Sequence, residues 1–99
     1  MNFKPSLDVA KNSVKQCIKE FNESFTGEYN VQQLEELKLK FETAFKSLDA
    51  NYLENFKQYT IIEIVLIIME ALSLDRVDNL TLSEEEINLA AQELYEHWV

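Results

Sequence analysis

The chain has 99 residues, a formal net charge of -9, one glycine and one proline. So little glycine excludes glycine-rich phosphate-binding loops and turn-dense β-sandwiches. Hydrophobic residues make up 46% of the chain and aromatic residues 11%, which excludes intrinsic disorder as the default state. We therefore expect one small folded domain over residues 1–99.

The negative charge is concentrated in the second half of the chain. Residues 51–99 contain ten carboxylates against only Lys57 and Arg76, whereas residues 1–50 are nearly neutral. An acidic surface disfavours nucleic acids and anionic membranes, which attract basic proteins. It favours a basic protein partner, because opposite charges steer two proteins together.

The sequence predicts a cytoplasmic protein. The first ten residues lack the apolar segment of a secretory signal peptide. The longest apolar stretch, Ile61 to Leu74, is interrupted by Glu63 and Glu70. It is also shorter than the roughly 18 residues that a membrane-spanning helix needs.

Helical spacing and capping residues predict two helices in the first half. Ser6 is a suitable N-cap for the first, and Asn22 to Asn30 is a polar break that contains Gly27. Asn30 and Gln33 form a capping-box pattern that starts the second helix. The apolar positions are Leu7, Ala10, Val14, Cys17, Ile18 and Phe21 in the first helix, and Val31, Leu34, Leu37, Phe41, Phe45 and Leu48 in the second.

In the middle of the chain, two further helix starts are expected. Asp49 is a plausible cap for a short helix that contains Tyr52, Leu53 and Phe56. Thr60 and Glu63 form another capping-box pattern before Ile61–Leu74. That segment is apolar on nearly all sides, which is typical of a helix buried at the centre of a bundle or against a partner.

The last helix is predicted to follow a loop over residues 75–81. Ser83 is its N-cap, and the glutamates of its first turn complement the positive end of the helix dipole. The sequence thus predicts an all-α protein, a single compact bundle of four to five helices with a nearly all-apolar central helix at about 61–74. The apolar positions of the last helix are Ile87, Ala90, Ala91, Leu94 and Trp98.

Catalytic chemistry finds little support in the sequence. The chain contains one histidine, His97, and one cysteine, Cys17, which excludes the usual zinc-binding spacings. It contains no nucleophile elbow, no P-loop and no dinucleotide-binding motif. We therefore expect no enzyme activity, no metal and no cofactor, and we expect Cys17 to pack in the core.

One segment, residues 75–86, resembles an EF-hand calcium loop. Asp75 and Glu86 stand at its first and last ligand positions, with Asn79, Thr81 and Ser83 between them. Val77 at the third position and Leu80 at the sixth depart from the pattern. Residues 22–33 resemble the same loop, with Gly27 at the sixth position but no carboxylate at the first or last. The resemblance implies a degenerate EF-hand-like regulator as one alternative function.

The function that the sequence favours is non-catalytic protein binding. By analogy of size, charge and helix content, we expect a small acidic inhibitor or immunity-type protein that neutralises a basic partner such as a nuclease toxin. A homo-oligomeric helical adaptor, with a homodimer formed through the apolar helix, is the other alternative. The predicted contact residues are Asp75, Asp78, Glu84, Glu85, Glu86, Glu93 and Glu96, with Tyr95 and Trp98 as aromatic anchors.

Overall fold

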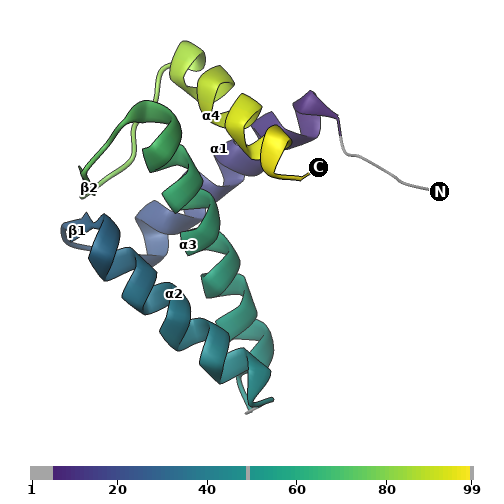
Figure 1. Cartoon of the computed structure of the whole chain (residues 1–99), viewed down its shortest axis with the longest axis vertical. Helices are drawn as coiled ribbons and strands as arrows, with labels where there is room; N and C mark the ends of the chain where they lie inside the picture. The colour runs from purple at the N-terminus through teal and green to yellow at the C-terminus, as the bar shows by residue number, and fades with distance from the viewer. Residues whose placement is uncertain (1–5, 49, 99) are drawn as a thin grey trace.

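The computed structural model describes residues 6–48 and 50–98, and it confirms an all-α helical bundle (Figure 1). Within these residues no helix combines the length and the apolar character needed to cross a membrane. The elements in chain order are α1 (Leu7–Ser24), β1 (Tyr29–Asn30), α2 (Val31–Lys46), α3 (Tyr52–Leu72), β2 (Arg76–Val77) and α4 (Glu84–His97).

Three of the predicted N-caps are confirmed. The Ser6 hydroxyl accepts a hydrogen bond from the Val9 amide at 3.3 Å. Asn30 and Gln33 form the reciprocal capping box, with bonds of 2.8 and 2.9 Å. Ser83 and Glu86 form a second one at the start of α4. These side chains satisfy amide groups that have no partner inside the helix, and so they fix where each helix begins.

The two helices predicted around residues 52–74 are a single helix, α3, and the predicted start at Thr60 is wrong. The Thr60 hydroxyl donates a hydrogen bond to the Phe56 carbonyl at 3.0 Å, as threonines do inside helices. The Thr-x-x-Glu pattern therefore falls within a helix that contains no glycine or proline to interrupt it. Asp49, the other predicted cap, lies outside the described residues.

The predicted break after α1 is shorter than expected, because α1 continues through Asn22 to Ser24. The loop after α1 and the loop after α3 pair as antiparallel strands, with Tyr29 opposite Val77 and Asn30 opposite Arg76. Two-residue strands are too short to show an alternating pattern, so the sequence analysis did not reveal them. The pairing joins the loop between α1 and α2 to the loop between α3 and α4.

The predicted central helix is confirmed, because α3 contributes to both hydrophobic clusters of the core. One cluster lies against α1, α2 and the paired loops, and includes Cys17, Leu34 and Val65. The other lies against α1 and α4, and includes Ile68 and Leu94. Cys17 is buried as expected.

The predicted apolar face of α2 is only partly correct. Leu34 is buried, and Leu37 and Phe41 pack against the core. Val31 is 38% exposed, and Leu48 is 72% exposed beyond the end of the helix. Only one side of α2 packs against the core. Apolar residues on its other sides therefore remain exposed to solvent.

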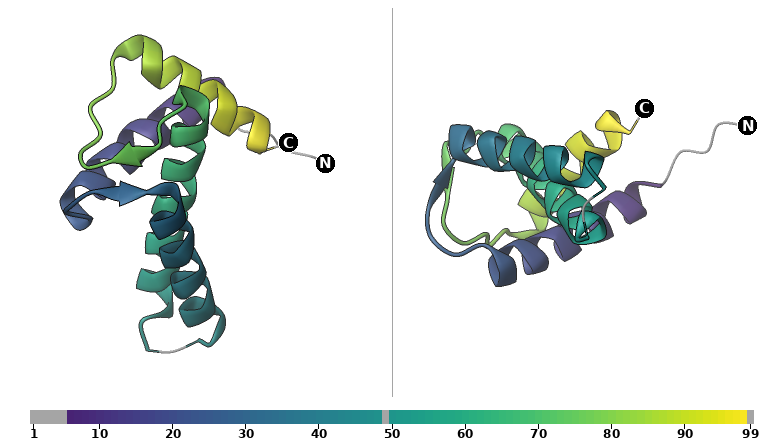
Figure 2. Two further views of the ribbon diagram at one scale, coloured as in Figure 1. Left: turned by 60° about the vertical axis from the view of Figure 1, so that its left-hand side comes forward. Right: turned by 90° about the horizontal axis from the view of Figure 1, so that it is seen from below.

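The hairpin formed by α2 and α3 projects from the rest of the bundle. Helices α1 and α4 cross its upper half in Figure 1, while its lower end extends away from them, as the two views of Figure 2 also show. The molecule measures 40 × 38 × 20 Å along its principal axes. We call residues 38–60, the projecting end of the hairpin, the arm.

Asn22 links α1 to the loop before α4. Its side-chain amide donates to the Leu80 carbonyl and accepts from the Leu80 amide, each at 2.9 Å. Leu80 is thereby held in the core, where it is 4% exposed. One side chain thus satisfies both backbone groups of a buried loop residue, which would otherwise lose hydrogen bonds to water.

We expect Asn22→Ala to lower the free energy of unfolding by about 2 kcal/mol, because it leaves the Leu80 amide and carbonyl without partners. Urea denaturation followed by circular dichroism measures the change. Asn12→Ala, at an exposed position of the same helix, is the matched control. Equal stabilities of the two variants would show that the Asn22–Leu80 link contributes nothing.

Candidate functional site

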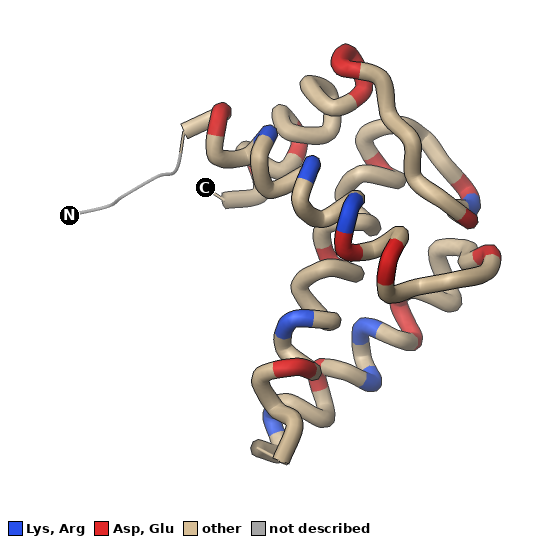
Figure 3. The backbone as a smooth tube through the Cα atoms, turned by 180° about the vertical axis from the view of Figure 1, so that it is seen from behind, with Lys and Arg blue, Asp and Glu red and all other residues tan. Residues whose placement is uncertain are grey.

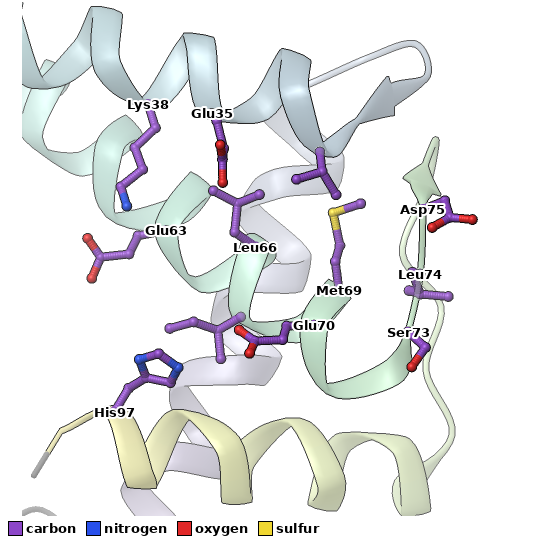
Figure 4. Close-up of a pocket in the computed structure, with 12 residues that line it drawn as sticks. Glu35, Lys38, Glu63, Leu66, Met69, Glu70, Ser73, Leu74, Asp75 and His97 are labelled. Carbon is purple, nitrogen blue, oxygen red and sulfur yellow. The ribbon is translucent and has the colours of Figure 1, made fainter.

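A groove of about 670 Å³ lies between α2, α3 and α4. Glu35 and Lys38 reach into it from α2, Glu63 and Glu70 from α3, and His97 from α4 (Figure 4). Apolar side chains form its base: Val31, Leu66, Ile67, Met69 and Leu74. The groove therefore offers an apolar surface bordered by polar groups.

The polar border of this groove is mainly acidic. Glu35, Glu63, Glu70 and Asp75 line it, and the lining cations are Lys38 and, when protonated, His97. Carboxylates that line a concave surface add their fields and attract cations more strongly than scattered surface charges do. We call this surface the acidic groove.

A single stripe of α3 connects the acidic groove to the arm. Tyr52, Phe56, Tyr59, Glu63, Leu66 and Glu70 alternate at spacings of four and three residues. That spacing places side chains along one face of a helix. The aromatic residues of the arm therefore continue the same face on which the groove carboxylates lie.

The arm exposes several large apolar side chains. Phe45 of α2 packs edge-on against Phe56 and Tyr59 of α3, with ring centroids 5.2 and 5.1 Å apart. Phe56 nevertheless remains 51% exposed and Leu53 69% exposed. Contiguous apolar surface of this kind marks interaction sites in proteins more often than isolated apolar residues do.

Tyr59 joins the aromatic cluster to the acidic groove. Its hydroxyl donates a hydrogen bond to Glu63, and this bond, with partial burial and the charges of Glu63 and Glu42, raises the pKa of Tyr59 to about 12. Lys38 lies over the same ring, with its Nζ 5.7 Å from the ring centroid. Tyr59 thus lies next to both the aromatic cluster of the arm and Glu63 of the groove.

The opposite side of the molecule carries basic as well as acidic positions. Seen from behind, basic positions recur along α1 (Figure 3). They are Lys11, Lys15 and Lys19, one helical turn apart. The acidic groove and this basic stripe give the molecule two electrostatically distinct faces.

The predicted contact residues lie on α4 and in the loop that precedes it. Because Ala90, Ala91 and Leu94 are buried, helical spacing turns Glu85 and Glu96 outward. Glu93 lies on the flank that faces α3. Asp78 and Glu84 are exposed, and Glu86 completes the capping box with Ser83 at the start of α4.

Only Asp75 of the predicted contacts lines the acidic groove, and the two predicted anchors face the core. Tyr95 and Trp98 pack against the cluster that α4 forms with α1 and α3. The exposed aromatic residues Tyr52 and Phe56 are on the arm instead.

The two EF-hand-like segments lie side by side through β1 and β2, but their end positions are engaged in the fold. Asn22, the first position of one segment, is bonded to Leu80. Glu86, the last position of the other, accepts a hydrogen bond from the Ser83 amide at 2.9 Å. Val77 and Leu80, at positions where a calcium loop needs a ligand and a glycine, are buried.

Sequence reasoning missed Glu35, Glu63 and Glu70 as site residues, although one signal was available. Glu63 and Glu70 stand seven residues apart in an otherwise apolar segment, so they share one face of the helix. A charged pair on a single face of a central helix indicates a side left open to solvent. Glu35 gave no such signal, because its position depends on how α2 packs against α3.

Comparison with protein-family models, with curated proteins and with solved structures found no match to this chain.

We expect Glu63→Gln to lower the pKa of Tyr59 toward its ordinary value of 10, since it removes the negative charge that opposes phenolate formation. Glu70→Gln, which removes an equal charge from the same groove, is the control. Tyrosine-selective NMR during an alkaline titration resolves the Tyr59 signal. Identical titration curves for the two variants would contradict the Tyr59–Glu63 hydrogen bond.

Proposed function

We propose that this chain is a non-catalytic protein-binding module that captures a basic partner protein on the face formed by the acidic groove and the arm. One observation supports this most strongly. Four carboxylates, the apolar lining of the groove and an exposed aromatic cluster lie on the same side of the α2–α3 hairpin. In this proposal the protein acts as an inhibitor or immunity-type protein that covers a basic surface, such as that of a nuclease toxin.

The division of roles within the face follows from physical chemistry. The carboxylates of the groove accelerate encounter with a cationic surface and orient it, an effect that salt weakens. The apolar base and the arm supply most of the affinity, because aromatic side chains that become buried at an interface dominate its energetics. A partner that presents lysines or arginines beside apolar residues satisfies both parts.

The placement of the two groups best suited to nucleophilic catalysis supports a non-catalytic role. Burial raises the pKa of the Cys17 thiol to about 12, which keeps it in the unreactive protonated form. Cys17 and His97 line different grooves, one between α1 and α3 and the other the acidic groove. They are therefore not placed as a nucleophile and its base.

A homo-oligomeric adaptor is the second candidate, and the exposed arm favours it. The arm contains four lysines against three carboxylates, so it is free of the acidic excess that would repel a second copy. Sedimentation of the chain alone separates the two candidates. A monomer agrees with capture of a foreign basic partner, whereas a dimer that persists on dilution assigns the arm to self-association.

The binding proposal is tested with a synthetic amphipathic helical peptide of lysine and leucine, titrated into the isotope-labelled protein at low salt. We expect the NMR shift changes to cluster at the acidic groove and the arm. Glu63→Gln with Glu70→Gln should weaken binding about tenfold, because two favourable charges are lost.

Glu84→Gln with Glu85→Gln is the matched control, since it removes the same charge from the exposed start of α4. A peptide with glutamate in place of lysine should not bind. If both double variants weaken binding equally, the attraction comes from net charge alone and the groove is not the site.

A further inference from the structure

Glu70, Glu93 and His97 converge where the last turns of α3 and α4 meet. One potential ligand atom from each lies within 4.8 Å of the other two. Figure 4 shows the Glu70 carboxylate extending from α3 toward the His97 imidazole, at the edge of the acidic groove. Glu93 and His97 stand one helical turn apart, so they project from the same side of α4.

An ordinary helix ion pair explains only part of this arrangement. The His97 Nε2 and Glu93 Oε1 atoms are 3.9 Å apart, longer than a hydrogen bond. Glu70 is contributed by another helix, and its carboxylate adds a second negative charge beside the first. A cation held among the three groups relieves the repulsion between the two carboxylates and links the helices that they belong to.

The donor set matches the preferences of zinc. Zn²⁺ binds imidazole nitrogen and carboxylate oxygen at about 2.0–2.2 Å, and sites with three protein ligands leave one position open. Tetrahedral ligands at these bond lengths are about 3.4 Å apart. All three side chains are partly or fully exposed, so small rotations about their side-chain bonds close the remaining distance.

From this geometry we propose that Glu70, Glu93 and His97 form a zinc-binding site that joins α4 to α3, with its open coordination position beside the acidic groove. The imidazole and the cross-helix carboxylate are both required. The site shares Glu70 with the proposed partner-binding face, but its test needs no partner, because zinc alone is the ligand.

The composition of the chain makes this proposal unusually easy to test. His97 is its only histidine and Cys17 its only cysteine. Cys17 is 3% exposed and donates a hydrogen bond to the Ile61 carbonyl, so its sulfur is not available to a metal in the folded protein. Zinc binding through an imidazole can therefore occur at His97 alone.

Isothermal titration of the full-length protein with zinc chloride tests the site directly. We expect one zinc ion per chain and a rise in melting temperature with zinc concentration, because a ligand that binds only the folded state stabilises it. The fluorescence of Trp98, the single tryptophan and the neighbour of His97, should change in the same titration. Calcium and magnesium should give none of these effects.

Three variants test which residues bind the zinc ion. His97→Asn and Glu70→Gln should each weaken zinc binding at least tenfold, while Glu96→Gln, at an exposed position of the same helix turn, should leave it unchanged. Circular dichroism confirms that each variant is folded. Binding that survives His97→Asn overturns the site, and binding that survives Glu70→Gln overturns the link between α3 and α4. Equal responses to calcium and zinc also overturn it, because they indicate an oxygen-only site such as the EF-hand-like segments.

Discussion

The need to cover α3 determines the architecture of this protein. The segment Ile61–Leu74 is apolar on nearly all sides, so it has to be surrounded by other elements. Helices α1 and α4 and the paired loops cover most sides of its C-terminal half, and α2 packs along it. Its N-terminal half contacts α2 within a projecting hairpin, so apolar side chains on the arm remain exposed.

One face of the α2–α3 hairpin stays open along the whole length of the stripe from Tyr52 to Glu70, and its chemistry changes along that length. Aromatic side chains occupy the arm, and carboxylates occupy the part beside α4. Tyr59 and Glu63 connect the two parts through their hydrogen bond. The same geometry brings Glu70 to the last turn of α4, so the open face and the proposed metal site both result from the length of α3.

The starts of α1, α2 and α4 are predictable from the sequence, because Ser6, Asn30 and Ser83 cap amide groups within one turn of themselves. The false start at Thr60 shows the limit of such local patterns, since Thr-x-x-Glu also fits a helix interior. The groove depends on how three helices converge, which no local pattern encodes. The contacts on α4 were predicted because their carboxylates are close together in the sequence. Glu35 is far from Glu63 and Glu70 in the sequence, and the three come together only in the folded structure.

The most direct test of the binding face is photo-crosslinking in the cells that produce the protein. A benzophenone amino acid is placed at Phe56 on the arm or at Leu89 on the outer side of α4, two exposed apolar positions on different surfaces. The account predicts that position 56 gives an adduct with a basic protein, that Glu63→Gln with Glu70→Gln removes the adduct, and that position 89 gives none. An adduct at position 89 without one at position 56 would contradict it and return the interface to α4.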